Sequence, residues 1–308
     1  MVMVFDRKTL VIPDKTCFEE KLISVVGDVV IGDRSLVHFG VKTDGRIFVG
    51  EHVITDGDLS ASNDVRIDIF SSIGGDICSG GNVYLGEKVK VAGKLSLSGD
   101  LDVGDSVEIE SGFEAKGWIN IRSPIPTVIY IFIYLLQLLK MGHSEEIERL
   151  LEELEQNDGE TIPISESFLF IPTGSIIGIA KSRIDYSLRV GNKCKIVGNY
   201  DIKGGITVED DTAMHGSLTA IEDVFCGNKV HVFGNIKTNG AVRIGEDSIV
   251  EGNIAADKII MAKSATVRGT LLAKHGTSFI TQTESAGEKV IRFDSNADVV
   301  DEVKELLE

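Results

Sequence analysis

Histidine is the side chain best suited to acid–base catalysis near neutral pH, because its ordinary pKa is about 6.5. The chain has six histidines, and only His38 has acidic residues eighteen positions away on both sides, Glu20 and Asp56. Such a set could act as a general base if the fold stacked residues at that spacing. A lone surface histidine is more often solvated than catalytic. We therefore expect no catalytic residue in this chain.

A row of acidic and amide residues also recurs at multiples of eighteen positions within each of two series. Stacked oxygens could bind calcium, but Asp and Asn also favour tight corners, and the nonapeptide spacing of calcium-binding coils is absent. We interpret the row as turn chemistry and expect no metal site. Its members are Asp33, Glu51, Glu87, Asp105, Asn192, Asp210, Asn228 and Glu246.

The four cysteines form neither a metal-binding nor a redox set. Cys194 and Cys226 fall at inward positions of the repeat described below, Cys78 falls at an outward position and Cys17 precedes the repeats. Buried thiols of this kind usually act as small hydrophobic side chains, and the spacing builds no zinc quartet. The sequence therefore predicts a protein that is not an enzyme and needs no cofactor.

Composition narrows the choice of partners. The 308 residues include 48 Asp or Glu and 31 Lys or Arg, for a net charge of −17. A chain this acidic is repelled by the phosphates of nucleic acid, so we expect no nucleic-acid partner. The first residues lack the basic start and apolar stretch of a secretory signal. We therefore expect a cytoplasmic protein.

The elements that would position these side chains follow an eighteen-residue repeat. A glycine after an aliphatic residue marks it, as at Gly32 and Gly50 in one series and Gly191 and Gly227 in another. In the last repeat of the second series the marker position is occupied by Lys263 instead of glycine. Further glycine corners lie seven and thirteen residues after most of the markers. A period of this length with three corners indicates a solenoid.

Apolar residues occupy equivalent positions in successive repeats, as expected when neighbouring coils stack their inward side chains. In the second series these columns end with Ile244, Ala262 and Ile280, with Val242, Ile260 and Ser278, and with Ile254 and Leu272. We predict an all-β solenoid: a three-sided parallel β-helix with eighteen residues per coil, in which each coil pairs with the next about 4.8 Å away.

The two series are out of phase, which divides the predicted fold into two lobes. We assign residues 1–26 to an N-terminal segment or cap, 27–122 to the first lobe, 123–160 to an α-helical insert, 161–284 to the second lobe and 285–308 to a C-terminal segment with an amphipathic helix.

The insert joins an apolar run to an amphipathic acidic arm, which predicts a helical hairpin. A helix that is apolar on all sides needs a cover: the outward strip of Val30, Phe48 and Tyr84 on the first lobe, a partner subunit, or the membrane interface at the inner face of the cell membrane. We favour a protein cover because the arm is acidic. The candidate contacts are Ile129, Tyr130, Phe132, Ile133, Tyr134 and Leu136.

Two segments carry a family resemblance: VRIGEDSIVEGNIAA at residues 242–256 and LDVGDSVEI at residues 101–109. They resemble the bactofilins, polymer-forming cytoskeletal proteins found mainly in bacteria. The resemblance covers the two coil regions. It implies a right-handed β-helix that stacks end to end into filaments without nucleotide. Typical members have one lobe between disordered tails, so two lobes and an insert are a departure from the family pattern.

Self-assembly is also the physical expectation, because an uncovered strand edge is a template for another copy. The candidate assembly surfaces are Phe113, Trp118, Ile119, Ile121, Phe279 and Ile280. We expect a bactofilin-like scaffold whose main partner is itself. The alternative is a hexapeptide-type acyltransferase or a ligand-binding protein with capped ends. Corners that step by 7, 6 and 5 residues, in place of three equal steps, disfavour the acyltransferase.

Overall fold

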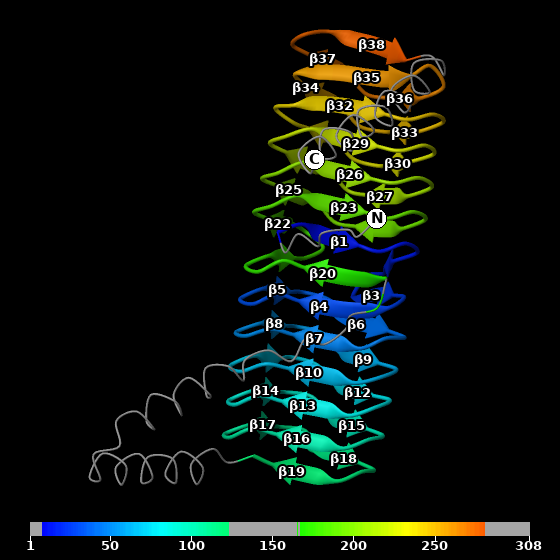
Figure 1. The fold of residues 1–308 in the computed structure, drawn as a ribbon. Coiled ribbons are helices and arrows are strands. Elements are labelled where there is room, and N and C mark those ends of the chain that lie inside the picture. The colour runs from blue at the N-terminus through cyan, green and yellow to red at the C-terminus, as the bar shows by residue number, and fades with distance from the viewer. Residues whose placement is uncertain (1–7, 123–164, 166, 281–308) are drawn as a thin grey trace, which may run out of the picture. The chain divides into compact units, whose positions relative to one another are not determined.

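The computed structural model describes residues 8–122, 165 and 167–280, and every regular element in them is a β-strand (Figure 1). The fold divides into two compact units, Met1–Gly178 and Ile179–Glu308. The predicted helical hairpin, with its candidate contacts from Ile129 to Leu136, and the predicted C-terminal helix lie outside the described residues. The prediction of an all-β solenoid of parallel coils is confirmed.

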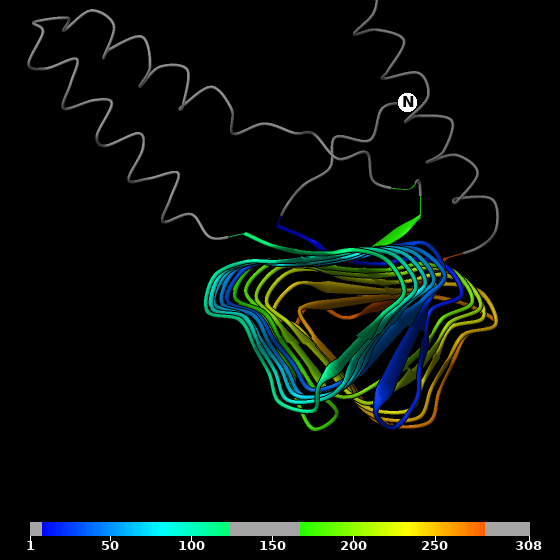
Figure 2. The same ribbon diagram turned by 90° about the horizontal axis from the view of Figure 1, so that it is seen from below.

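The first unit is a three-sided coil, seen end-on in Figure 2, with one short strand on each side of every turn. One side consists of β4 (Asp28–Ile31), β7 (Ile47–Val49), β10 (Val65–Ile67), β13 (Val83–Leu85), β16 (Leu101–Val103) and β19 (Ile119–Ile121). The next consists of β5 (Leu36–Val37), β8 (Ile54–Thr55), β11 (Ser72–Ile73), β14 (Lys90–Val91) and β17 (Glu108–Ile109). The third consists of β6 (Gly40–Thr43), β9 (Leu59–Ala61), β12 (Ile77–Ser79), β15 (Leu95–Leu97) and β18 (Phe113–Ala115).

Parallel pairing in register stacks equivalent residues of successive coils. Val65 of β10, for example, pairs with Ile47 on one side and Val83 on the other, and all three are fully buried. Because consecutive side chains of a strand point to opposite faces, the first and last residues of a strand such as β10 point inward and its middle residue, Arg66, points outward. The predicted inward columns of the first lobe are therefore the core.

The coil next to β4, β5 and β6 is assembled from two distant parts of the chain. β20 (Phe168–Ile171) pairs in parallel with β4, and β21 (Ile176–Ile177) pairs in parallel with β5. The third side of this coil is β3 (Leu22–Val25), which pairs in parallel with β6. Residues 168–177, assigned from sequence to the second lobe, thus belong to the first unit.

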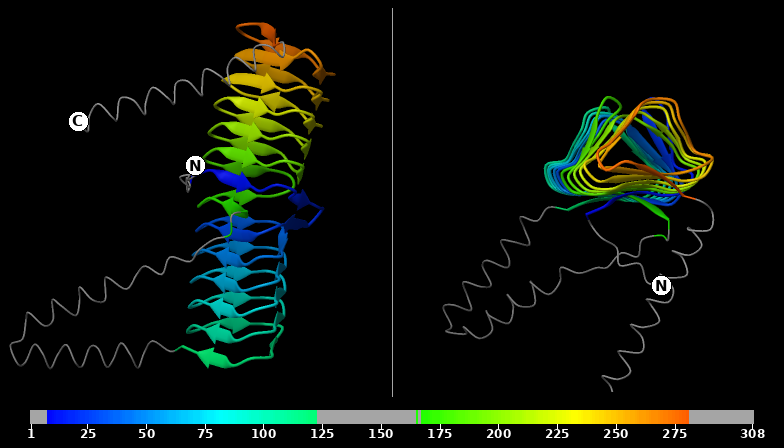
Figure 3. Two further views of the ribbon diagram at one scale, coloured as in Figure 1. Left: turned by 45° about the vertical axis from the view of Figure 1, so that its right-hand side comes forward. Right: turned by 90° about the horizontal axis from the view of Figure 1, so that it is seen from above.

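Two antiparallel strands follow this composite coil. β1 (Leu10–Ile12) pairs with β20, and β2 (Cys17–Phe18) pairs with β3, both antiparallel (Figures 1 and 3). Residues 10–25, assigned to an N-terminal segment or cap, therefore extend the sheets of the first unit. Leu10, Ile12 and Phe18 are buried there and add to the core.

The second unit has the same three-sided plan, with all of its internal pairings parallel. One side consists of β22 (Ser182–Ile184), β25 (Tyr200–Ile202), β28 (Leu218–Ala220), β31 (Ile236–Lys237), β34 (Ile254–Ala256) and β37 (Leu271–Ala273). The next consists of β23 (Leu188–Val190), β26 (Ile206–Val208), β29 (Val224–Cys226), β32 (Ala241–Ile244), β35 (Lys258–Ala262) and β38 (Thr277–Ile280). The third consists of β24 (Lys195–Val197), β27 (Ala213–His215), β30 (His231–Val232), β33 (Ile249–Val250) and β36 (Thr266–Val267).

One coil of the second unit is a residue shorter than the repeat, which corrects the predicted register of its end. The sequence columns placed Ala262 and Ile280 after Ile244. In the structure Ile244 pairs with Met261, and Met261 pairs with Phe279. Ile254 likewise pairs with Leu271 and not with Leu272. The residue is lost at the corner of Asp257, where the turn between β34 and β35 is tighter. The inward column that contains Ile244 therefore continues with Met261 and ends with Phe279.

Candidate functional site

The described histidines lie on the outer surface and contact neighbouring side chains. His38 Nδ1 lies 2.5 Å from the Asp56 carboxylate of the next coil, and His231 Nε2 lies 2.9 Å from Glu251. His215 stacks on Phe233 with 4.3 Å between ring centroids. Its pKa is lowered, chiefly by burial and then by the nearby positive charge of Lys195. His231 also stacks on Phe233, with 3.9 Å between ring centroids, so His215, Phe233 and His231 form one small aromatic cluster. No contact of Glu20 with His38 accompanies the Asp56 pair within the described residues.

The predicted turn chemistry of the acidic and amide row is confirmed by a hydrogen-bonded ladder. Asn192 Oδ1 accepts from the backbone N–H of Asp210 at 3.2 Å, Asp210 Oδ1 accepts from Asn228 at 2.6 Å, and Asn228 Oδ1 accepts from Glu246 at 2.8 Å. Each side chain therefore ties its own corner to the corner of the next coil. No group of three or more His, Cys, Asp or Glu suited to a metal ion is found in the described residues.

Another corner ladder explains why glycine recurs there. Asp64 Oδ1 accepts from the N–H of Asn82, and Asn82 Oδ1 accepts from Asp100. A Cβ on Gly81 would collide with the Asp64 carboxylate, and a Cβ on Gly99 would collide with the Asn82 amide. Glycine is required at these corners by the close approach of the neighbouring coil.

The cysteines lie as the repeat predicted. Cys194 and Cys226 are buried, Cys78 is exposed and Cys17 is half-buried, and no disulfide joins any of them. Burial raises the pKa of Cys226 to about 12. A thiol in this state is a core side chain and not a nucleophile.

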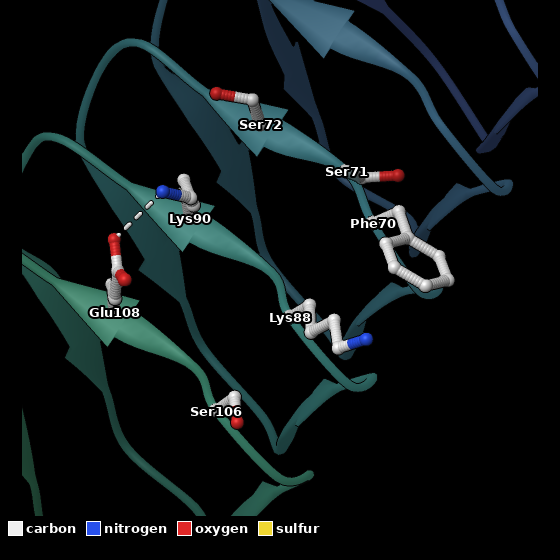
Figure 4. A pocket seen from close by; sticks show the side chains of 7 residues that line it. All are labelled: Phe70, Ser71, Ser72, Lys88, Lys90, Ser106 and Glu108. Carbon is white, nitrogen blue, oxygen red and sulfur yellow. Dashed lines mark ion pairs between the residues drawn. The ribbon is translucent and has the colours of Figure 1, made fainter.

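A shallow hollow lies on the outside of the first unit (Figure 4). Its side chains are committed to one another. Lys90 pairs with Glu108 at 3.0 Å, Lys88 lies 4.8 Å from the centre of the Phe70 ring, and Ser71 donates to the Gly50 carbonyl. This arrangement holds neighbouring coils together and presents no acid–base or nucleophilic set.

The open end of the first unit has a different character. β17, β18 and β19 each pair with one strand within the described residues, so the opposite edge of each strand is free of a strand partner. The inward column of Ile67 and Leu85 continues into this coil at Ile121. Ile67 is 1% exposed and Ile121 is 71% exposed. The hydrophobic core therefore runs out to the surface here.

Four predicted assembly residues lie on this coil. Phe113, Ile119 and Ile121 are inward residues of β18 and β19, and all are exposed. Trp118 lies at the corner before β19, where its backbone N–H donates to Asp100 Oδ1 at 2.8 Å and its side chain is exposed. Ile109 of β17 is a fifth apolar residue of this end that the sequence analysis did not name; it continues the column of the buried Val91.

The open end of the second unit is formed by β36, β37 and β38, each with one strand partner within the described residues. Phe279 is 59% exposed, whereas its register partner Met261 is 4% exposed. Ile280, the other predicted assembly residue, is half-buried and lies one position outside that column.

Charge distinguishes the two open ends. Residues 105–122, here called the acidic end, contain Asp105, Glu108, Glu110 and Glu114 against Lys116 and Arg122. Residues 263–280, here called the basic end, contain Lys263, Arg268 and Lys274 and no carboxylate. These charges were not among the features predicted from sequence, although counting them over the last eighteen residues of each series reveals the contrast.

Comparisons with protein-family models, with curated proteins and with solved structures found no match. In the part of the chain that the structure describes, no helix is long and apolar enough to cross a membrane.

Proposed function

We propose that this protein is a bactofilin-like scaffold, not an enzyme, that assembles into filaments or larger polymers without nucleotide by stacking the open coil ends of its β-helical units. The sequence resemblance of residues 101–109 and 242–256 to bactofilins motivates the family assignment. The supporting observation is an apolar core column that is buried at Ile67 and Leu85, half-buried at Val103 and exposed at Ile121 in the terminal coil.

Two physical arguments support assembly through these ends. An unpaired strand edge offers backbone N–H and C=O groups to another chain, and solenoids that remain monomeric usually carry a polar outer face on their last repeat. Here the inward side chains of the acidic end are Ile109, Phe113, Ala115, Ile119 and Ile121. Covering them with a second copy removes apolar surface from water and satisfies the strand edges together.

The test is negative-stain electron microscopy and sedimentation of the full chain without nucleotide, with Ile121→Asp and Phe279→Asp as variants. We expect the wild type to form polymers and both variants to lose them, because each buries a charge in the contact. Phe225→Asp is the matched control, since Phe225 is an exposed aromatic residue on the outer face of an inner coil. Small particles only from the wild type, or polymers from both end variants, would overturn the proposal.

A further inference from the structure

We infer that the contact between copies joins unlike ends: the acidic end of one copy binds the basic end of the next. This inference rests on the proposed self-assembly and specifies its interface. It starts from the charge contrast of the two terminal coils, four carboxylates and two cations at residues 105–122 against three cations and no carboxylate at residues 263–280.

Ion pairs with the preceding coils reduce this contrast without reversing it. At the acidic end, Glu108 pairs with Lys90, Glu114 with Lys94, and Arg122 with Asp102. When those partners are included, this end still has five carboxylates against four cations.

The basic end keeps its sign in the same way. Arg268 pairs with Glu251, and His275 lies 2.8 Å from Asp257. With these two carboxylates included, the three cations Lys263, Arg268 and Lys274 remain in excess. The side chains in all of these pairs are partly or largely solvent-exposed, so the pairs are weak and can rearrange on contact with another copy.

Three contacts between ends are possible, and charge separates them. Acidic against acidic places Glu108, Glu110 and Glu114 opposite their own copies, and basic against basic does the same with Lys263, Arg268 and Lys274. Like charges across a sheet or interface destabilise it. Contact between the acidic end and the basic end is attractive. It also brings apolar surfaces together, since Phe279 meets the exposed core column of the acidic end.

Backbone geometry allows this contact. Each open end is the C-terminal coil of its unit, and coils of one handedness that meet at such ends run in opposite directions. Their edge strands would pair antiparallel, as β1 pairs with β20 within the first unit. Inward residues still face inward residues in antiparallel pairs, so the two cores become continuous.

An interface between unlike surfaces does not close on itself unless the copies form a ring. It generates open-ended polymers in which every subunit points the same way. The inference therefore adds a polarity to the proposed filament: one growing end exposes the acidic coil and the other exposes the basic coil.

Charge reversal tests this arrangement. One variant carries Glu108→Lys, Glu110→Lys and Glu114→Lys; a second carries Lys263→Glu, Arg268→Glu and Lys274→Glu; a third carries all six substitutions. We expect each of the first two to raise the critical concentration for assembly about tenfold or more, because both of its ends then have the same sign. The critical concentration of the variant with all six substitutions should return to within about threefold of the wild-type value. Glu87→Lys with Lys237→Glu, both on inner coils, leaves the net charge unchanged and is the control for charge reversal away from the ends.

Salt provides a second readout on the unmodified protein. Attraction between unlike ends weakens as ionic strength rises, whereas repulsion between like ends is relieved. We expect polymer mass in sedimentation to fall between about 50 and 500 mM NaCl, over which the screening length shortens severalfold. Circular dichroism on every variant ensures that lost assembly is not lost folding.

The outcomes are distinct. If both triple variants form polymers as readily as the wild type, or if polymer mass increases with salt, the pairing of unlike ends is wrong. Neither result would contradict the proposed scaffold function. The pairing of unlike ends is also wrong if the variant with all six substitutions keeps its fold but does not regain assembly. Absence of polymers from the wild type at every salt concentration would overturn both proposals.

Discussion

Asp28 and Ser165 are 137 residues apart in sequence and joined by two hydrogen bonds. The Asp28 backbone N–H donates to Ser165 Oγ at 3.0 Å, and the Ser165 backbone N–H donates to Asp28 Oδ2 at 2.9 Å. The Asp28 carboxylate also pairs with Arg46 Nη2 at 2.5 Å. One buried side chain thus connects the returning chain to two coils of the first unit.

This arrangement predicts an acid-sensitive contribution to stability. Burial alone would raise the pKa of Asp28, but hydrogen bonds from Arg46 and Ser165 outweigh burial and hold the pKa below its usual 3.8. A carboxylate with a lowered pKa in the folded state stabilises the protein above its unfolded pKa, and this stabilisation is lost as pH falls through the folded value. We expect Asp28→Asn to cost about 2 kcal/mol at pH 7 and progressively less below about pH 4.

Urea denaturation at a series of pH values measures this effect. Asp185→Asn is the control, because Asp185 also pairs with a cation, Lys203, but both side chains are about half exposed. The explanation fails if the difference between Asp28→Asn and wild type stays constant from pH 7 to pH 3.

The two ends of one core column should respond differently to the same substitution. Ile67→Ala opens a cavity in a fully packed coil and should cost about 2–5 kcal/mol in free energy of unfolding. Ile121→Ala removes a side chain that is 71% exposed, so the isolated subunit should lose far less, while the critical concentration for assembly rises. Chemical denaturation of dilute protein and sedimentation of concentrated protein separate the two effects. Equal losses of stability in both variants would mean that Ile121 is already covered within the subunit.

The corner ladders predict a smaller and more local cost. Asn235 Oδ1 accepts from the backbone N–H of Asn253 at 2.8 Å, and its own N–H donates to Ser217 Oγ at 3.1 Å. Asn235→Ala leaves the Asn253 N–H without this acceptor and should cost about 1 kcal/mol. Asn239→Ala, at an exposed corner of the same coil, should change the unfolding midpoint little. A similar shift from the two variants would deny the ladder a role in stability.

Thiol reactivity should separate the cysteines. Burial raises the pKa of Cys226 to about 12, compared with an ordinary value of 9.0, which lowers the thiolate fraction about a thousandfold. Cys78 is exposed. Iodoacetamide labelling followed by mass spectrometry should modify Cys78 in the folded protein, and Cys194 and Cys226 only after denaturation. Rapid labelling of Cys226 in the native state would show that the coils around it open readily.

The repeating part of the fold could be predicted from sequence because every repeat places apolar residues at the same inward positions. Val29, Ile47, Val65 and Val83 share one inward column, and each confirms the register of the others. The turn role of Asp210 and Asn228 followed from the same periodicity, since a corner residue that recurs every eighteen positions faces its counterpart in the next coil.

Features that occur once were not predictable in this way. The pairing of Phe168 with Asp28 joins segments that share no spacing with each other, and the antiparallel position of β1 has no counterpart in the repeat. The shortened corner at Asp257 was missed because the markers continue to Lys263 by chance, although the glycines do show it: Gly269 follows Gly252 by seventeen residues. The charges of the open ends carry no periodic signal at all.

The composite coil has a consequence for the order of folding during synthesis. Two of its three sides come from residues 168–177, so the ribosome finishes all of the strands from β4 to β19 before it makes the strands that cover β4 and β5. Until then β4 presents an unpaired edge through the translation of more than a hundred residues. At typical elongation rates this interval lasts on the order of ten seconds, which is long compared with the formation of the local coils. Closure of the first unit is therefore a late, long-range step, and the nascent chain passes through a state in which β4 and β5 are open to pairing with another copy.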